Sequence, residues 1–228
     1  MLTSDPKILA SALIGGIIPS LLWLWFWLKE DSDKPEPKGI LAIVFILGMI
    51  AVICVLPIQR IIQESISLQE LQIVVLASSE EIIKYLAVMI VLYKTTFIEE
   101  TIDWPIYLIT SALGFAALEN SLFLLKPFSL GQNTVGLLTG ELRFLGSTLL
   151  HTVSSGMLGM ALGMSLHLYG LKRKIYLAIG MFSAIALHSI FNFFIMKNSG
   201  NDFLKVFGLL WVVTIIVMLL FEKVRRMD

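Results

Sequence analysis

Two glutamates and a lysine lie close together in a segment that is otherwise apolar enough to cross a membrane. Glu80, Glu81 and Lys84 fall inside Ile73–Tyr93. A carboxylate at the centre of a spanning helix costs roughly 2.5–3.5 kcal/mol on insertion scales, so such residues usually have a function. Two neighbouring carboxylates can share a proton, and one then acts as a base while the other stays neutral. The three residues therefore indicate acid–base chemistry inside the membrane.

Three later apolar segments also carry polar side chains that could take part in such chemistry. They are Glu119 and Asn120 in Trp104–Leu125, His151 in Leu142–Tyr169, and His188 and Asn192 in Ile175–Met196. Glu80 and Lys84 are four residues apart, as are His188 and Asn192, so each pair shares one helix face. One segment therefore presents a carboxylate with an ammonium group, and another an imidazole with an amide.

The four segments place these groups at a similar depth. We measured each depth from the end of the segment on the side of the N-terminus, at a rise of ~1.5 Å per residue. Glu80 lies about 10 Å in, Glu119 about 9 Å, His151 about 14 Å and His188 about 12 Å. Because neighbouring segments run in opposite directions, random placement would not favour this agreement. We expect one polar site in that half of the membrane.

Two kinds of hydrolysis are open to this set of residues. A carboxylate, alone or paired with a histidine, can activate water for attack on a carbonyl, while Lys84 holds the glutamates in place. His188 and Asn192 can then donate hydrogen bonds to the developing oxyanion. Alternatively, His151 and His188 with one or two glutamates, Glu119 among them, make a zinc set, although the His-Glu-x-x-His motif is absent. The spacing does not decide between these mechanisms.

Each residue also has a purely structural explanation. The Glu80–Lys84 pair could only fix helix packing, His151 could be a hydrogen-bonded core residue, and Asn120 could bond to a neighbouring helix. Taken together, these explanations weaken, because several polar groups at one depth would insert at a summed cost of several kcal/mol or more. We therefore favour a functional site, with Lys84 and Asn120 in supporting roles.

The composition is that of an integral membrane protein. Of the 228 residues, 57% are hydrophobic, and the mean hydropathy is +0.87. Soluble domains rarely exceed half apolar content. The formal net charge is zero, with 17 basic and 17 acidic residues, so nothing in the charge suggests nucleic-acid binding. The single cysteine, Cys54, has no partner for an internal disulfide and is expected to be a buried core residue.

About 20 apolar residues cross a bilayer as a helix, and the sequence has about seven such segments. They are Ile8–Leu28, Ile40–Leu56, Ile73–Tyr93, Trp104–Leu125, Leu142–Tyr169, Ile175–Met196 and Phe203–Phe221. We predict an all-α polytopic membrane protein, with residues 1–228 as a single transmembrane domain and the polar site between helices 3, 4, 5 and 6. The mixed segment Arg60–Glu70 could form an interfacial helix.

The basic residues predict an orientation. With seven spans, the linkers after spans one, three and five and the C-terminus lie on one side and hold ten lysines and arginines, against six on the other side. Cytoplasmic loops carry the excess of basic residues. We therefore predict that the N-terminus is outside the cell membrane and the C-terminus is cytoplasmic, which puts the polar site in the outer half.

Four stretches in this order resemble the PrsW family of polytopic membrane proteases, which is related to the CAAX-protease and bacteriocin-processing group. They are Glu80-Glu81-Ile-Ile-Lys84, Phe115-Ala-Ala-Leu-Glu119-Asn120, His151 followed by Gly-rich turns, and Leu187-His188-Ser-Ile-Phe-Asn192. The loop Asp33–Lys38 is similar to an acidic, proline-containing loop after the family's first span. Where relatives in the wider group have histidine in the second motif, this chain has Glu119.

The resemblance implies a transmembrane protease domain that cuts a single-span membrane protein, such as an anti-sigma factor, on the extracytoplasmic side of the bilayer. It assigns Glu80 and Glu81 as water-activating base and partner, and His188 and Asn192 as oxyanion donors. It also implies metal dependence by analogy. Two other functions remain open from the residues alone: a small proton- or cation-coupled transporter, and a non-catalytic scaffold that binds a partner span.

Overall fold

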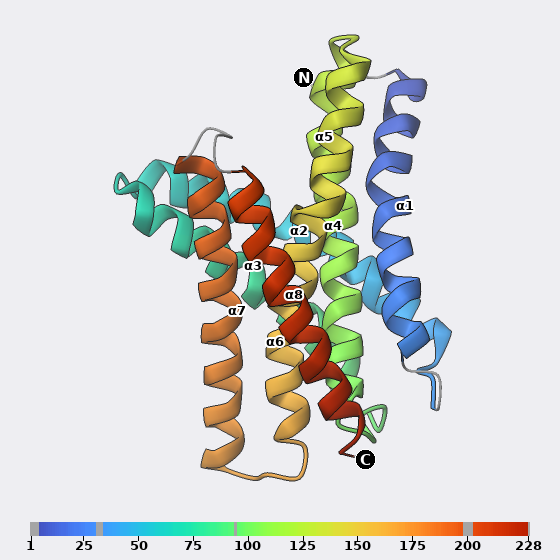
Figure 1. Cartoon of the computed structure of the whole chain (residues 1–228), viewed down its shortest axis with the longest axis vertical. Helices are drawn as coiled ribbons and strands as arrows, with labels where there is room; N and C mark the ends of the chain where they lie inside the picture. The colour runs from blue at the N-terminus through green and yellow to red at the C-terminus, as the bar shows by residue number, and fades with distance from the viewer. Residues whose placement is uncertain (1–4, 31–33, 94, 198–202, 228) are drawn as a thin grey trace.

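The structure is a computed structural model that describes residues 5–30, 34–93, 95–197 and 203–227 (Figure 1). Asp33, in the loop that resembles the family pattern, lies outside the described residues. The regular elements in the described part of the chain are all helices. They are α1 (Pro6–Glu30), α2 (Lys38–Ser65), α3 (Gln69–Leu92), α4 (Asp103–Ser129), α5 (Asn133–Leu145), α6 (Ser147–Met164), α7 (Leu171–Lys197) and α8 (Phe203–Arg225). The predicted all-α class is confirmed.

The helix α4 lies at the centre of the bundle, and the two ends of the chain lie at opposite ends of the molecule (Figure 1). α4 packs against α1, α2 and α6, and it is buried along most of its length. Helices α3 and α7 pack against each other and complete the bundle on the side of α6. This arrangement surrounds the polar residues of α3, α4, α6 and α7 with helices.

Glycines let the neighbours of α4 approach its backbone. A Cβ at Gly48 of α2 would collide with the carbonyl oxygen of Ser111, and one at Gly159 of α6 would lie 2.5 Å from the Cα of Pro105. Small residues at helix crossings of this kind are typical of membrane bundles, where close packing replaces the hydrophobic effect as the driving force for association. The crossings fix the heights at which α2 and α6 present their side chains to α4.

Five helices among the described residues, α1, α2, α4, α7 and α8, are long and apolar enough to cross a membrane. The helices α3 and α6 are not among them, and these carry Glu80, Glu81, Lys84 and His151. The polar residues of the site thus make α3 and α6, by composition, less suited to crossing a membrane than the five helices named above. A polytopic membrane protein is confirmed, and the count of seven spans stays a prediction.

Several boundaries differ from those expected from the sequence. α2 continues through Pro57 to Ser65, so the stretch expected as an interfacial helix is mostly the end of α2. The fifth expected span, Leu142–Tyr169, is divided at Gly146 into α5 and α6, and a Cβ at Gly146 would meet the ring of Phe207 at 2.8 Å. Cys54 is exposed on α2 instead of buried.

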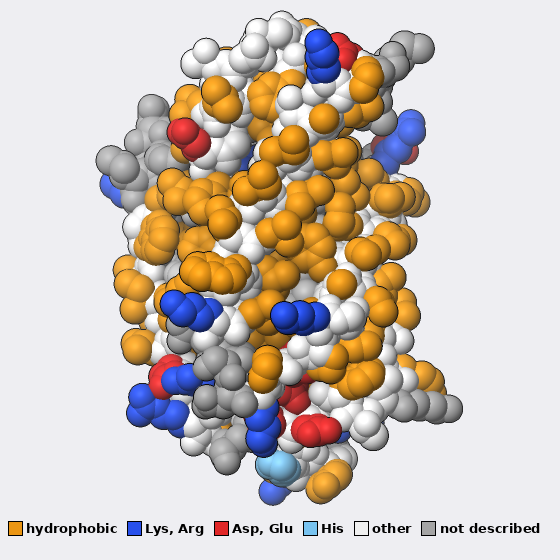
Figure 2. Space-filling view, turned by 90° about the vertical axis from the view of Figure 1, so that its right-hand side faces the viewer, with side chains coloured by type: hydrophobic (Ala, Val, Ile, Leu, Met, Phe, Trp, Pro, Cys, Tyr) orange, Lys and Arg blue, Asp and Glu red, His pale blue; other side chains and the backbone are white. Residues whose placement is uncertain are grey.

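The face of the molecule shown in Figure 2 is largely hydrophobic across its middle, while basic and acidic side chains gather toward the end that holds the C-terminus. Many large apolar side chains point outward, among them Ile53, Ile90, Phe182 and Leu219. In water such a surface would be costly, and in a bilayer it is the surface that contacts lipid.

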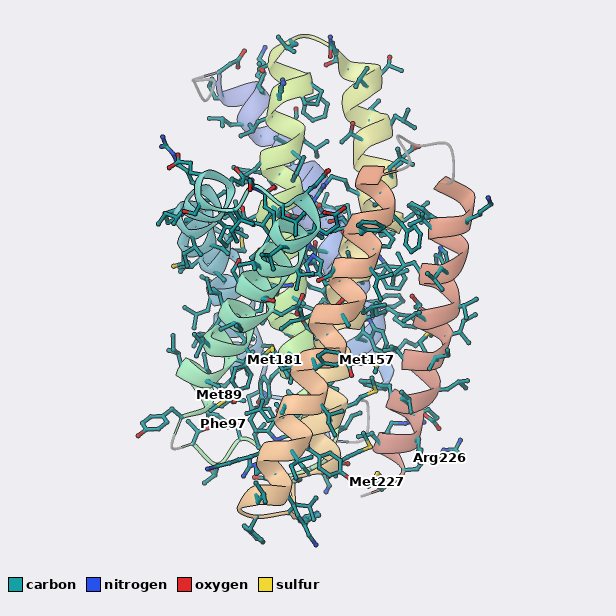
Figure 3. The ribbon with its side chains drawn as sticks, turned by 90° about the vertical axis from the view of Figure 1, so that its left-hand side faces the viewer. Met89, Phe97, Met157, Met181, Arg226 and Met227 are labelled. Carbon is teal, nitrogen blue, oxygen red and sulfur yellow. The ribbon has the colours of Figure 1, made fainter. Side chains whose placement is uncertain are left out.

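An apolar layer closes one side of the polar residues. Met89 of α3, Met157 of α6 and Met181 of α7 are partly buried against the main hydrophobic core (Figure 3). Each lies five to seven residues from Lys84, His151 or His188 in its own helix, toward the end of the molecule that holds the C-terminus. At ~1.5 Å per residue this is about 8–10 Å. The side chains next to the polar site on that side are therefore apolar.

Candidate active site

The carboxylate of Glu81 is the buried centre of the polar cluster. Its Oε1 accepts hydrogen bonds from the Nζ of Lys84 at 2.6 Å and from the Nδ1 of His188 at 2.7 Å. Its Oε2 accepts one from the Oγ of Ser155 at 2.9 Å. Glu81 and Lys84 have exposures of 1% and 0%. A buried charge pair is tolerated only when hydrogen bonds satisfy the remaining polar atoms, and this cluster meets that condition.

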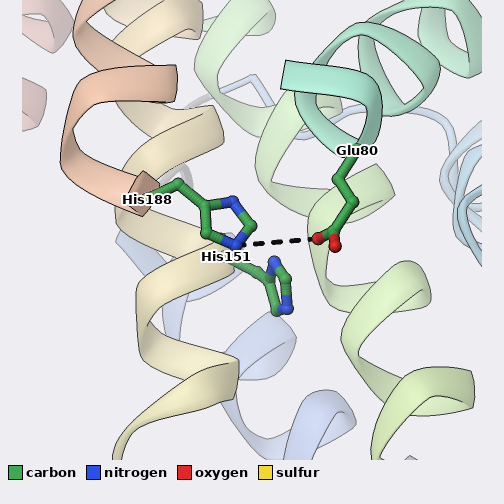
Figure 4. A group of neighbouring side chains, drawn as sticks. All are labelled: Glu80, His151 and His188. Atoms are coloured by element: carbon green, nitrogen blue, oxygen red, sulfur yellow. Dashed lines mark ion pairs between the residues drawn. The ribbon is translucent and has the colours of Figure 1, made fainter. Parts of the chain in front are cut away.

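Glu80 has one carboxylate oxygen without a hydrogen-bond partner. Its Oε1 accepts a hydrogen bond from the Nε2 of Gln59 at 2.8 Å. Its Oε2 is buried and has no partner among the described residues. The nearest basic atom is the Nε2 of His188 at 3.6 Å, which is beyond hydrogen-bond distance (Figure 4). Because the Nδ1 of His188 donates to Glu81, its Nε2 presents a lone pair to the same space.

His151 connects the buried cluster with a second carboxylate. The Nζ of Lys84 lies 3.0 Å from its Nδ1, and its Nε2 lies 3.1 Å from the Oε2 of Glu119. An ammonium group can only donate, so Nδ1 accepts and Nε2 donates to Glu119. The rings of His151 and His188 meet edge to face with centroids 5.0 Å apart. The imidazole of His151 thus stands between Lys84 and Glu119.

Glu119 lies at the more open edge of the cluster, with a side-chain exposure of 20%. Its Oε2 is paired with the Nη2 of Arg143 and also accepts a hydrogen bond from the Oγ of Ser147 at 3.3 Å. Neighbouring Asn120 accepts a hydrogen bond from the Nε of Arg143 at 2.6 Å and donates one to Thr148 at 2.8 Å. The motif residues of α4 are thus tied to α5 and α6.

Glu80, His151 and His188 form a group that could hold a metal ion, with one ligand atom from each lying within 4.8 Å of the others. Figure 4 shows the three side chains directed toward one another. One carboxylate and two imidazoles are the protein ligands of several catalytic zinc sites. The unpartnered Oε2 of Glu80 and the free lone pair of His188 fit a cation. The sequence had placed Glu119 in this set, but in the structure the carboxylate of the group is Glu80.

The structure brings together all but one of the expected site residues. Asn192, half-buried on α7, makes no hydrogen bond with the other site residues in the described part of the chain. Its expected role and that of His188 as oxyanion donors stay predictions, as do the catalytic roles of the other residues.

Two residues of the site were missed from the sequence: Gln59 and Arg143. A spacing signal was present for Arg143. Arg143, Ser147, His151 and Ser155 follow one another at intervals of four, which places them along one helix face. No such signal marks Gln59, since it lies beyond the apolar part of its helix.

The comparisons with known proteins agree with this site. The model of a family described as PrsW family intramembrane metalloprotease matches residues 36–221, which include Glu80, Glu81, Glu119, His151 and His188. The chain belongs to the PrsW family.

Three relatives are each named Protease PrsW. The protein of Oceanobacillus iheyensis is 27% identical over 210 residues, covering 90% of this chain and 93% of the relative, and that of Geobacillus kaustophilus is 25% identical over 206 residues, covering 88% of each. The protein of Bacillus subtilis is 32% identical over 114 residues, covering 48% of this chain and 52% of the relative. No solved structure matches the chain significantly.

As a PrsW-family member, this chain is an intramembrane peptidase located in a membrane. The family is described as one of metalloproteases, and the structure contains a Glu–His–His group able to hold a metal ion.

Proposed function

We propose that this chain cuts a single-span membrane protein, of the anti-sigma-factor kind, near the extracytoplasmic face of the bilayer, with a zinc ion held by Glu80, His151 and His188. The observation that carries the metal is the buried Oε2 of Glu80, which has no hydrogen-bond partner among the described residues and lies 3.6 Å from the Nε2 of His188. A buried carboxylate oxygen left without a partner is costly, and a bound cation removes that cost.

Zinc at this position would supply a water-derived nucleophile and polarise the scissile carbonyl. The chain's own residues then have separate tasks. Glu81 accepts three hydrogen bonds, so it has little capacity left to take a proton and instead orients His188 through Nδ1. His151 would hold the metal through one ring nitrogen. The sequence had paired Glu81 with Glu80 in activating water, and the hydrogen bonds favour this orienting role instead.

Glu119 is the residue best placed to take the proton from the attacking water. Its Oε2 is held by Arg143 and Ser147, while its Oε1 has no hydrogen-bond partner among the described residues. It is also the most exposed carboxylate of the site. A general base must have a free lone pair within reach of water, and Oε1 has the free lone pair on a side chain that is 20% exposed.

Three features support cleavage at the extracytoplasmic side. The excess of basic residues predicts a cytoplasmic C-terminus. The methionine layer of Met89, Met157 and Met181 closes the site toward the end that holds the C-terminus. The partly exposed residues Glu119 and Arg143 lie at the opposite edge of the site, so water and substrate would enter from the outer side.

The test is cleavage in liposomes of a single-span reporter that carries the transmembrane region of an anti-sigma factor. We expect a chelator to abolish cleavage and added zinc to restore it. Glu80→Gln and His188→Ala should lose both cleavage and bound zinc, while the matched control His167→Ala, an exposed histidine outside the site, should keep both. Full cleavage by the metal-depleted protein would overturn the zinc mechanism. Reporter that co-purifies uncut under every condition would favour a scaffold.

A further inference from the structure

Arg143 makes a set of contacts that no other cation in the described part of the chain makes. Its Nη2 is paired with Glu119 and donates to the Oγ of Ser147 at 2.9 Å, while its Nε donates to the Oδ1 of Asn120 at 2.6 Å. Its guanidinium carbon lies 3.8 Å from the ring centroid of Phe123. The side chain is 18% exposed, so most of its surface is covered by the surrounding protein.

These contacts hold the side chains of Glu119 and Asn120, which are neighbours on α4, at the same time. Arginine carries its donors in a rigid planar group. Because its Nη2 pairs with Glu119 and its Nε donates to Asn120, the guanidinium group fixes the positions of these two side chains relative to each other. Asn120 is further fixed by the bond to Thr148. The Oε2 of Glu119 is therefore fully engaged, and only Oε1 remains to face water.

Arg143 acts across a break between two helices. It lies in the last turn of α5, and Ser147 is the first residue of α6, with Gly146 between them. His151 follows one turn later and donates to the same Oε2 of Glu119. The guanidinium group thus joins α4, α5 and α6 at the edge of the site, although among the described residues no hydrogen bond or ion pair joins it to Glu80, His151 or His188.

We propose that Arg143 is a positioning residue for peptide-bond hydrolysis, which holds Glu119 with its Oε1 directed to the attacking water. This inference rests on the proposed function. Arg143 acts through Glu119 and does not contact the substrate. Loss of the guanidinium group should lower the rate of the chemical step, with little change in substrate binding or in the metal content.

The experiment compares Arg143→Gln, Arg143→Lys, Glu119→Gln and the double variant Arg143→Gln/Glu119→Gln in the liposome assay. A general base typically contributes about 10²–10⁴-fold, and Arg143→Gln misplaces the base without removing it, so we expect it to lower kcat by about 10–100-fold with KM nearly unchanged. Arg143→Lys keeps the positive charge but not the planar set of donors, so its kcat should lie between those of the parent protein and Arg143→Gln. The double variant should be no slower than Glu119→Gln alone, because both changes disable the same group.

Two controls separate this role from a structural one. Arg60→Gln removes an arginine that pairs with Glu64 on the surface, and it should leave kcat unchanged. Bound zinc and the unfolding temperature of Arg143→Gln should stay close to those of the parent protein. If Arg143→Gln does not fold, Ser147→Ala, which removes a weaker tie to the same Oε2, should still show a smaller loss of kcat with unchanged KM.

The outcomes distinguish the two proposals. A double variant slower than Glu119→Gln by the full Arg143→Gln factor, or a rise in KM with unchanged kcat, would mean that Arg143 contacts the substrate and would overturn the positioning role. An impaired Glu119→Gln beside a fully active Arg143→Gln would refute only this inference. A fully active Glu119→Gln would remove Glu119 from the proposed function as well.

Discussion

The Nζ of Lys84 lies 3.0 Å from the Nδ1 of His151, and this contact joins the two halves of the site. On one side Lys84 is paired with Glu81 at 2.6 Å, and on the other His151 reaches Glu119. The ammonium group is fully buried and lies 4.8 Å from the ring centroid of Phe115. A single buried lysine therefore connects the carboxylates of α3 with that of α4 through an imidazole on α6.

The first prediction concerns the stability that Lys84 provides. Lys84→Met would leave the buried carboxylate of Glu81 without its compensating charge, and removing one partner of a buried pair costs about 3–5 kcal/mol. We expect a corresponding fall in the free energy of unfolding, measured by denaturant titration in detergent. The control Lys172→Met removes an exposed lysine and should change stability little. Adding Glu81→Gln to Lys84→Met should recover part of the loss, and a failure to recover any would contradict the pairing.

The second prediction concerns the metal affinity that Glu81 provides. Glu81→Gln would leave one acceptor oxygen but remove the negative charge, so the Nδ1 of His188 would be held by a weaker, neutral acceptor. We expect zinc affinity to fall about 10–100-fold, measured by competition with a zinc-binding dye. The control Glu64→Gln alters an exposed carboxylate and should leave the affinity unchanged. Equal zinc affinity in the two variants would mean that Glu81 does not support the metal ligands.

The third prediction concerns the crossing of α4 and α6. Gly159→Val would place a branched side chain against the backbone of Pro105, which cannot move aside as a flexible side chain could. Overpacking of this kind costs about 1–3 kcal/mol. We expect a lower unfolding temperature in detergent together with reduced cleavage, because α6 carries His151. The control Gly208→Ala adds a methyl group to open space on α8 and should be tolerated.

The fourth prediction concerns the orientation of the chain in the membrane. In a Cys54→Ser background, we place single cysteines at Gln132, between α4 and α5, and at Lys172, at the start of α7, both of which are exposed. A membrane-impermeant maleimide should label Gln132→Cys in intact cells and Lys172→Cys only after lysis. The reverse pattern would put the site on the cytoplasmic side and contradict extracytoplasmic cleavage.

Much of the site could be predicted from residue types alone. Glu80, Glu81, Glu119, His151 and His188 stand out because an ionisable side chain in an apolar segment is costly and therefore rare. Their similar depth followed from the fixed rise of a helix, and the structure confirms that they meet. The residues that the sequence did not reveal, Gln59 and Arg143, lie where apolar segments end, and polar side chains there are too common to attract notice.

The sequence by itself determined the helical class, the membrane location and the height of the polar groups. It did so because a backbone in lipid must satisfy its hydrogen bonds within each helix, which leaves the helix rise as the measure of depth. The tertiary structure decided which polar groups touch: Glu80 stands with the two imidazoles, and Glu119 is held by Arg143. That choice depends on how far each helix is rotated about its axis, and close contacts such as those of Gly48 and Gly159, far apart in the chain, set that rotation.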